Sequence, residues 1–352
     1  MVNSKVKKNI NAAIVLFGLL VSSQVGATTI NIINFDGFNE GLNSNVPVSP
    51  VPGNSATTLG GQFFNVFRAA ADFWEQKIDS SVPIDMEVEL NPLPCSAGFG
   101  TLGQAGPINA AVNFPNSPRA DTWHVIALAN SIAGQDLDPI NGDLFAEFNS
   151  SVGSTNCLEN FNWWLGINSP APPNTISLFD TVLHEIAHGI GFLTFVNQAG
   201  IRFMDLDDVF MLNLFDQTQD LAWANMNNAQ RAFSSINTGA LVWSGSAVAA
   251  GAGVISQGRN GGLLRLFAPS LFQPGSSVSH WDTVLTPNEL MEPFATPVSN
   301  SCATELALND MGWRIINTEN ACGNIFAGPP VPPRLGPVVA PFLFEILDED
   351  DE

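Results

Sequence analysis

The sequence predicts an α+β fold for a chain of 352 residues. The first observation is the order of its local patterns, which is strand, helix, three strands and a second helix before residue 192. The second is that the patterns after this helix are irregular and partly helical, without internal repeats. The third is a hydrophobic content of 45%, which is typical of a globular chain.

The first half of these elements follows from simple periodicities. Residues 29–35 alternate branched apolar residues with Asn and predict a strand. A loop rich in Asn, Pro, Gly and Ser runs to about residue 61, and apolar residues at helical spacing then predict an amphipathic helix over residues 62–78. Residues 83–90 alternate Ile, Met and Val with acids, so a half-buried strand is expected there.

The second half leads to a helix with a clear start. Residues 123–129, WHVIALA, form a continuous apolar run typical of a central buried strand, and residues 143–149, DLFAEFN, alternate as an edge strand would. After the turn PAPPN, Ser177 and Asp180 supply a capping box for a helix that should end at Gly189 or Gly191.

The remaining elements are less regular. Residues 192–279 predict mixed helix and loop, with DVFMLNLFD, residues 208–216, as the best helical candidate. Residues 304–311 predict a short helix before Gly312 and Trp313. Residues 323–352 are rich in Pro and then in acids, which predicts a disordered tail.

The N-terminus has the pattern of a signal peptide over residues 1–27. Lys5, Lys7 and Lys8 precede an apolar run at residues 12–21, and small residues follow up to Ala27. The apolar run is short for a membrane span, so we expect an exported protein, extracellular or periplasmic, without a membrane anchor after cleavage. The first strand would then follow directly, leaving no room for a propeptide.

Charge excludes several partners. The formal net charge is -21, and removal of three signal-peptide lysines would make it -24. Such a surface repels nucleic acid and anionic membranes. Surplus carboxylates can also bind Ca²⁺, for which Asp205, Asp207 and Asp208 are weak candidates because no full calcium loop is present.

Four cysteines fit an exported chain with two disulfides. Three pairings are possible, and proximity in the sequence favours Cys95–Cys157 and Cys302–Cys322. A zinc site made of the cysteines is disfavoured because the chain has no CxxC pair.

The stretch DTVLHEIAHGIGF, residues 180–192, carries the chemistry. His184 and His188 are four residues apart and share one face of the predicted helix, where both imidazoles can reach one metal ion. Glu185 lies where it can polarise a metal-bound water without being a ligand. A catalytic zinc usually takes three protein ligands, and the chain has two more histidines. His280 lies in a loop suited to ligation, whereas His124 lies in a buried-looking strand and is expected to be structural or to support the site from outside.

Together, HEIAHGIGF, then SHWD, then ELMEP resemble the leishmanolysin-like branch of the metzincin zinc peptidases. The long metzincin motif HExxHxxGxxH is matched up to Gly191, but Thr194 stands at its last position. In the leishmanolysin-like branch an insertion separates this helix from the third histidine. The resemblance implies that His280 is the third zinc ligand, Met291 the Met-turn residue and Gly191 the glycine of the turn beneath the metal.

The resemblance also implies a fold and an activity. The fold would be a two-lobed catalytic domain over residues 28–322, with a twisted mixed sheet and the active-site helix in an upper lobe, residues 28–191. A mostly irregular or helical lower lobe would comprise residues 192–322. The activity would be that of a secreted zinc endopeptidase, in which a metal-activated water attacks the peptide bond and Glu185 is the general base. A protein or peptide substrate would lie along the predicted edge strand, residues 143–149.

Several points stay open in the sequence. The chain has no Tyr, so an oxyanion would be stabilised by zinc, by a backbone N–H or by another donor. Asp282 could support a ligand or face water, whereas Trp163, Trp164 and Trp313 are expected to pack in the core. Two alternatives to a peptidase remain, a secreted binding or adhesion protein with an inactive metzincin-like site, and a zinc hydrolase acting on a non-peptide amide.

Overall fold

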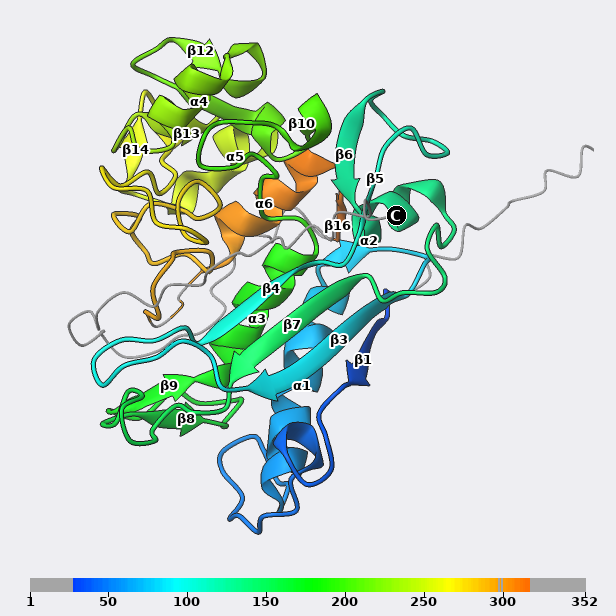
Figure 1. The fold of residues 1–352 in the computed structure, drawn as a ribbon, viewed down its shortest axis with the longest axis vertical. Helices are drawn as coiled ribbons and strands as arrows, with labels where there is room; N and C mark the ends of the chain where they lie inside the picture. The colour runs from blue at the N-terminus through cyan, green and yellow to red at the C-terminus, as the bar shows by residue number, and fades with distance from the viewer. Residues whose placement is uncertain (1–27, 297, 299, 317–352) are drawn as a thin grey trace, which may run out of the picture.

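A four-stranded sheet organises the N-terminal half of the computed structural model, which describes residues 28–296, 298 and 300–316 (Figure 1). The strand order is β1-β3-β7-β4, in which the first three strands are parallel and the last is antiparallel. These strands are β1 (Ile30–Asn34), β3 (Ile84–Asn91), β7 (Leu144–Asn149) and β4 (Gly103–Pro107). The predicted strands at residues 29–35 and 83–90 are confirmed, and β3 alternates buried and half-buried residues as its sequence pattern requires.

The prediction of an edge strand at residues 143–149 is wrong. β7 lies between β3 and β4, and the antiparallel strand β4 ends the sheet instead. Alternation along a strand shows that one face is more buried than the other, but it does not show whether both edges are paired. The edge strand was missed because its sequence, GQAGP, has little β propensity.

Two long helices pack on one face of this sheet. α1 (Leu59–Glu75) begins three residues earlier than predicted because the Thr58 side chain accepts a hydrogen bond from the Gly61 backbone N–H. α3 (Leu178–Gly189) is the helix of the HExxH motif. The indole N–H of Trp74 donates to the Leu183 carbonyl at 3.0 Å, which ties α1 to α3 through the core.

The apolar run at residues 123–129 is not a central strand. Only β6 (Thr122–Val125) is extended, and the chain turns into α2 (Ile126–Ala133) directly afterwards. β6 belongs to a separate three-stranded sheet with β5 (Ala110–Ala111) and β10 (Asp207–Asp208). A short apolar run fits a buried helix as well as a buried strand, and here it contains part of each.

The segment after α3 is built from short elements that gather on the side of the sheet bordered by β4 (Figure 1). The helix predicted at residues 208–216 is absent; the end of β10 is followed there by a single 3₁₀ turn, η3, and the strand β11. The predicted C-terminal helix is confirmed as α6 (Cys302–Met311), with Gly312 as its C-cap. The other elements of this segment are η2 (Phe203–Asp205), η3 (Met211–Asn213), β11 (Leu214–Asp216), β12 (Leu221–Ala222), η4 (Trp223–Asn225), α4 (Asn228–Ser234), β13 (Leu241–Trp243), α5 (Ser246–Gly251), η5 (Ala252–Val254), β14 (Arg259–Asn260) and β15 (Leu263–Leu264).

Small pairings and a disulfide complete the described structure. The remaining elements are η1 (Gly41–Asn43), β2 (Ile78–Asp79), which pairs with β16 (Arg314–Ile315), and β8 (Asn162–Trp164), which pairs with β9 (Thr175–Ser177). The disulfide Cys95–Cys157 is confirmed. Cys302 is also disulfide-bonded, whereas its expected partner Cys322, the predicted signal peptide and the predicted tail lie outside the described residues.

None of the helices in the described ranges has the length and apolar character needed to cross a bilayer.

Candidate metal centre

The helix α3 starts and is oriented as its sequence predicts. The Ser177 side chain accepts a hydrogen bond from the Asp180 backbone N–H at 3.1 Å, which caps the first turn. Close packing on the sheet requires glycine at the other end, since a Cβ atom on Gly189 would lie 2.7 Å from the Leu144 side chain. The face that carries His184 and His188 is thereby fixed relative to the sheet.

The end of α3 positions His188. The Phe192 N–H donates to the Ala187 carbonyl and the Gly191 N–H donates to the His188 carbonyl, the paired bonds of a Schellman motif. Gly191 has a φ of +124°, a conformation that side chains other than glycine rarely adopt, and so it is the turn glycine expected from the motif. The turn brings the Phe192 carbonyl back over the helix, where it accepts a hydrogen bond from Nδ1 of His188 at 2.8 Å.

Thr194, at the last position of the long motif, does not point into the histidine group. Its hydroxyl donates to the Asp208 carboxylate at 2.8 Å, and its backbone N–H donates to the Ser279 hydroxyl at 3.2 Å. Ser279 immediately precedes His280. The chain that carries His280 is therefore attached at the place where the long motif would supply its own third histidine.

His280 is presented by a firmly held segment. Its carbonyl accepts a hydrogen bond from the Phe267 N–H, and the next residue, Trp281, forms an antiparallel bridge with Leu266. The Trp281 ring is fully buried against Phe192 and Trp243. Nδ1 of His280 bonds to the Ser276 carbonyl at 2.9 Å. The long insertion thus provides the apolar packing and the carbonyl that orient the third imidazole.

Met291 lies in a tight turn next to His184. The Glu292 N–H donates to the Glu289 carbonyl across this turn, and the Leu290 carbonyl accepts a hydrogen bond from Nδ1 of His184 at 2.8 Å. The Glu289 carboxylate accepts hydrogen bonds from the backbone N–H and the hydroxyl of Thr304, which anchors the turn to the first turn of α6. Met291 itself is fully buried.

The three imidazoles converge on one point. The Nε2 atoms of His184 and His188 are 3.1 Å apart, those of His184 and His280 are 3.1 Å apart, and those of His188 and His280 are 3.2 Å apart. Within the part of the chain that the structure describes, these residues form the one group of His, Cys, Asp or Glu side chains that could hold a metal ion. The structure therefore brings together all three predicted ligands.

The hydrogen bonds of this group leave it suited to bind a cation. Each Nδ1 faces a backbone carbonyl and so carries the proton, which leaves a lone pair on each Nε2. Burial lowers the pKa of His184 to about 4 and, together with the neighbouring imidazoles, lowers the pKa values of His188 and His280 well below their usual range. Three neutral nitrogens with lone pairs 3.1–3.2 Å apart repel one another, and a cation between them would turn this repulsion into attraction.

The spacing of the nitrogens fits a tetrahedral zinc site. Two ligand atoms at tetrahedral positions, each 2.0–2.1 Å from zinc, lie about 3.3 Å apart. The observed separations of 3.1–3.2 Å are close to this value. The carbonyl partners of the Nδ1 atoms are also those expected around a metal-binding histidine, because they fix its tautomer.

Glu185 adds a buried acid to the group. It precedes His188 by three residues on α3, so the two side chains are neighbours on the helix surface. Its side chain is 3% exposed, and Oε2 has no hydrogen-bond partner. Burial raises the pKa of this carboxyl to about 8. A cation within about 4–6 Å would favour the ionised form of Glu185. A positive ion between the three histidines would therefore also stabilise the Glu185 carboxylate.

Other residues considered in the sequence lie outside the group. His124 is buried with Nδ1 at 3.0 Å from the Thr122 carbonyl, and burial lowers its pKa. Asp282 does not face water, since it is buried and forms an ion pair with Arg265 at 2.5 Å. Trp313 packs in the core as expected, with its indole N–H donating to the Ile190 carbonyl.

Two of the three candidate calcium carboxylates have other partners. Asp207 pairs with Arg202 at 2.8 Å, and Asp208 accepts hydrogen bonds from Thr194, Phe195 and Met211. Asp208 therefore acts as a connector between the end of α3 and the segment that follows β10.

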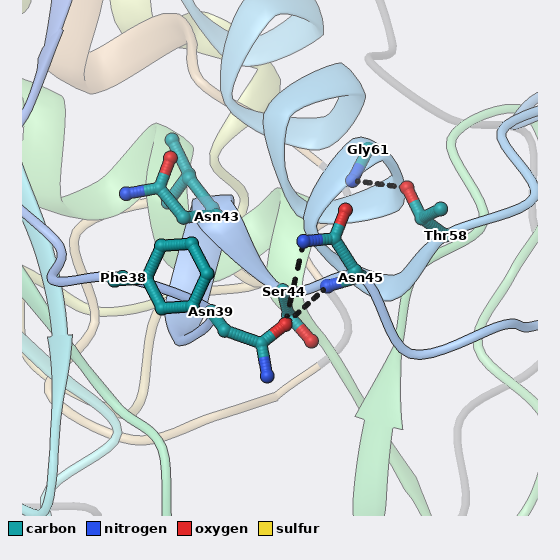
Figure 2. Close-up of a pocket in the computed structure, with 8 residues that line it drawn as sticks. Phe38, Asn39, Asn43, Ser44, Asn45, Thr58 and Gly61 are labelled. Carbon is teal, nitrogen blue, oxygen red and sulfur yellow. Dashed lines mark hydrogen bonds between the residues drawn. The ribbon is translucent and has the colours of Figure 1, made fainter.

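A surface pocket of about 530 Å³ lies elsewhere in the fold, around η1 and the first turn of α1 (Figure 2). Neither the histidines nor Glu185 line it. Figure 2 shows the Asn39 side-chain oxygen accepting hydrogen bonds from the backbone and the side chain of Asn45. Thr58, on its rim, is the cap of α1. These hydrogen bonds stabilise the loop between η1 and α1.

Sequence reasoning missed the carbonyls that orient the histidines and the glycine that lies beside Glu185. The carbonyls of Phe192, Ser276 and Leu290 carry no signal in the sequence, because any residue has one. Gly103 lies on the unrecognised edge strand β4, where a Cβ atom would come within 3.1 Å of the Glu185 side chain. Comparison of the chain with protein-family models, curated proteins and solved structures finds no match.

Proposed function

We propose that this protein is a zinc-dependent endopeptidase of the metzincin type, with His184, His188 and His280 as ligands. The observation that carries the proposal is the convergence of three neutral Nε2 atoms beside a buried acid that has an unbonded oxygen. A structural zinc site would more often have four protein ligands, usually with cysteine among them. A site with three histidines leaves a position for a reacting group.

The chemistry divides between the ion and the chain. When bound, zinc supplies a Lewis acid and lowers the pKa of a coordinated water towards about 7. Glu185 receives the proton of the attacking water and then delivers it to the leaving amine. Its position on the helix that carries two ligands keeps this carboxylate at a fixed place relative to the reacting atoms.

In this proposal the substrate binds along β4, the strand that ends the sheet, in place of residues 143–149. Asn149 N donates to the Leu102 carbonyl and Ile108 N donates to the Asp143 carbonyl, which identifies the hydrogen-bonded positions of the β4–β7 ladder. Hydrogen-bonded and non-hydrogen-bonded positions alternate, so the N–H and C=O groups of Gly103 and Ala105 point away from β7. An extended peptide can pair with these groups and add a strand to the sheet.

Three local features support the metzincin assignment over another zinc hydrolase. Gly191 ends the active-site helix in a sharp turn, Met291 lies in a tight turn that contacts His184 through its neighbour, and an antiparallel strand ends the sheet. The two lobes of a metzincin would correspond to the sheet with α1 and α3, and to the elements that follow α3. The disulfide Cys95–Cys157 fits the secreted location in the same proposal.

The test combines metal content with peptide cleavage. The mature chain should hold one zinc per molecule and cleave casein or gelatin, and Glu185→Gln should keep the zinc and lose at least about 100-fold in kcat. A wild-type protein that holds zinc and cleaves no protein would favour the binding or adhesion protein. Cleavage of small amides without cleavage of peptides would favour the non-peptide hydrolase.

A further inference from the structure

Gly103 lies on β4, 82 positions before Glu185, yet the two residues touch. A Cβ atom built on Gly103 would lie 3.1 Å from both Cγ and Oε1 of Glu185, and 3.1 Å from Cδ1 of Phe148. Ordinary Cβ contacts are longer than about 3.4 Å. The space that a side chain would fill at position 103 is therefore occupied by the side chain of the acid.

The backbone of Gly103 does not itself require glycine. Its φ does not lie in the left-handed region, unlike that of Gly191. An alanine could adopt the same extended conformation, and the contact with its neighbours is what excludes the methyl group. Steric contact, and not chain conformation, is the reason for glycine at this position.

Of the two neighbours, Glu185 is the one that can move. The Phe148 ring is fully buried and packs edge-on against Phe67, with ring centroids 4.9 Å apart. The end of the Glu185 side chain has no such restraint, since Oε2 has no hydrogen-bond partner. A methyl group at position 103 would therefore push the Glu185 carboxylate by a few tenths of an ångström and leave the ring in place.

Gly103 also faces the substrate side of the strand. Its N–H and C=O belong to the non-hydrogen-bonded positions of the β4–β7 ladder and point away from β7, towards the side on which β4 ends the sheet. One residue thus contributes backbone groups to the edge along which a peptide would lie and leaves room for the acid that would act on that peptide.

We infer that Gly103 is a positioning residue, whose missing side chain sets the distance between the Glu185 carboxylate and a peptide held on the edge of β4. This inference rests on the proposed peptidase activity for its meaning, but the contact between the two residues can be measured without it. A role in positioning predicts an effect on kcat. A role in packing alone predicts an effect on stability that does not depend on Glu185.

The first measurement uses the zinc-loaded full chain and compares Gly103→Ala with Gly98→Ala. Gly98 lies in the loop before β4, is exposed, and would have nothing within 4 Å of an added Cβ atom. We expect Gly103→Ala to lower kcat about 10-fold with KM and zinc content within about 2-fold of wild type, because small displacements of reacting groups are costly. Gly98→Ala should match wild type. Equal kcat values for the two variants would overturn the inference.

The second measurement needs neither zinc nor activity. Thermal unfolding of the chelated protein is compared for wild type, Gly103→Ala, Glu185→Ala and the double variant, a double-mutant cycle. Gly103→Ala should lower Tm by about 2 °C or more in the presence of Glu185 and by clearly less in the Glu185→Ala background, where the methyl group has room. The same loss in both backgrounds, or failure of both to fold, would show that Phe148 and not Glu185 limits the site.

The two measurements separate the inference from the proposed function. A wild-type chain that binds zinc and cleaves no peptide argues against the peptidase, and the unfolding cycle still decides whether Gly103 holds Glu185 in place. A cleaving wild type with no coupling in the cycle keeps the peptidase and removes the role of Gly103.

Discussion

The Nε2 atoms of His188 and His280 lie 3.2 Å apart, although 92 residues separate the two histidines in the chain. This contact depends on two carbonyl partners, Phe192 for His188 and Ser276 for His280. It also depends on the aromatic packing of Trp281 against Phe192. The third imidazole is thus delivered by the folded insertion to the end of the helix that carries the other two.

Replacement of His280 should abolish tight metal binding. The His280→Ala variant has two imidazoles left, and we expect its zinc affinity to fall by more than the 10–100-fold typical of changes outside the ligand set. The measurement is a competition titration with a chromogenic chelator. His124→Gln is the matched control, because His124 is the one histidine outside the group, and it should keep one zinc at wild-type affinity.

An unchanged zinc affinity in His280→Ala would remove this residue from the ligand set. Loss of zinc in both variants, with both folded, would instead show that the effect is not specific to the group. Far-UV circular dichroism on the same samples separates unfolding from loss of a ligand.

Substitution of Gly191 should destabilise the chain and loosen His188. An alanine at a φ of +124° is strained by about 1–3 kcal/mol. The Schellman turn that holds the Phe192 carbonyl on His188 would adjust to relieve this strain. We expect Gly191→Ala to lower Tm by several degrees and to weaken zinc binding, whereas Gly98→Ala should do neither. A Tm equal to that of wild type would contradict the strain argument.

Local patterns predicted the elements whose signals are local. The helix of His184 was found from its cap at Ser177 and from apolar periodicity, and α6 from the same kind of pattern. The prediction of a helix at residues 208–216 is wrong. The apolar residues of this segment belong to a 3₁₀ turn and a short strand, which pack against segments distant in the sequence. The local secondary-structure propensity of a short stretch of sequence gives no information about such long-range contacts.

In the candidate site, too, some residues follow from local sequence patterns and others do not. The pair His184 and His188 follows from a spacing of four on a helix, which needs no knowledge of the rest of the fold. Only the family resemblance predicts His280 as a ligand, because no local pattern connects this residue with His188, 92 residues before it. Gly103 was not recognised, because its meaning is a steric contact with Glu185 that exists only in the folded chain.

Loss of the disulfide Cys95–Cys157 should cost substantial stability. The two cysteines are 62 residues apart, and closing a loop of this length lowers the entropy of the unfolded chain by an amount equivalent to about 4 kcal/mol. Replacement of both cysteines by serine should therefore lower the urea midpoint clearly. Paired substitution is preferable to a reducing agent, because Cys302 is also disulfide-bonded. An unchanged urea midpoint would show that this disulfide does not lower the entropy of the unfolded chain by the expected amount.

The metal-free protein should lose stability as the pH rises above 6.5. Burial raises the pKa values of several carboxyl groups, namely Asp143 to about 6, Asp208 to about 6, Asp180 to about 7, Glu289 to about 7 and Glu185 to about 8. Each of these groups holds its proton more tightly in the folded chain than in the unfolded chain. The stability it contributes is present at low pH and is lost as the pH rises through the folded pKa.

The three clustered histidines act in the opposite direction, but over a lower range. Their pKa values are depressed by burial, so the folded chain gains stability from them as the pH rises to about 6.5 and nothing further above that value. Of the groups named here, only the acids still lose protons between pH 6.5 and 8.5. In the presence of a chelator, Tm should therefore fall by several degrees over this interval.

Glu185 has the highest of these pKa values, so the Glu185→Gln variant should show a smaller fall in Tm. Zinc should also reduce the fall in Tm, because a nearby cation favours the ionised carboxylate. A Tm that stays constant or rises from pH 6.5 to 8.5 in the chelated wild type would mean that these acids are already ionised in the folded chain, and that Glu185 does not need the cation to carry its charge.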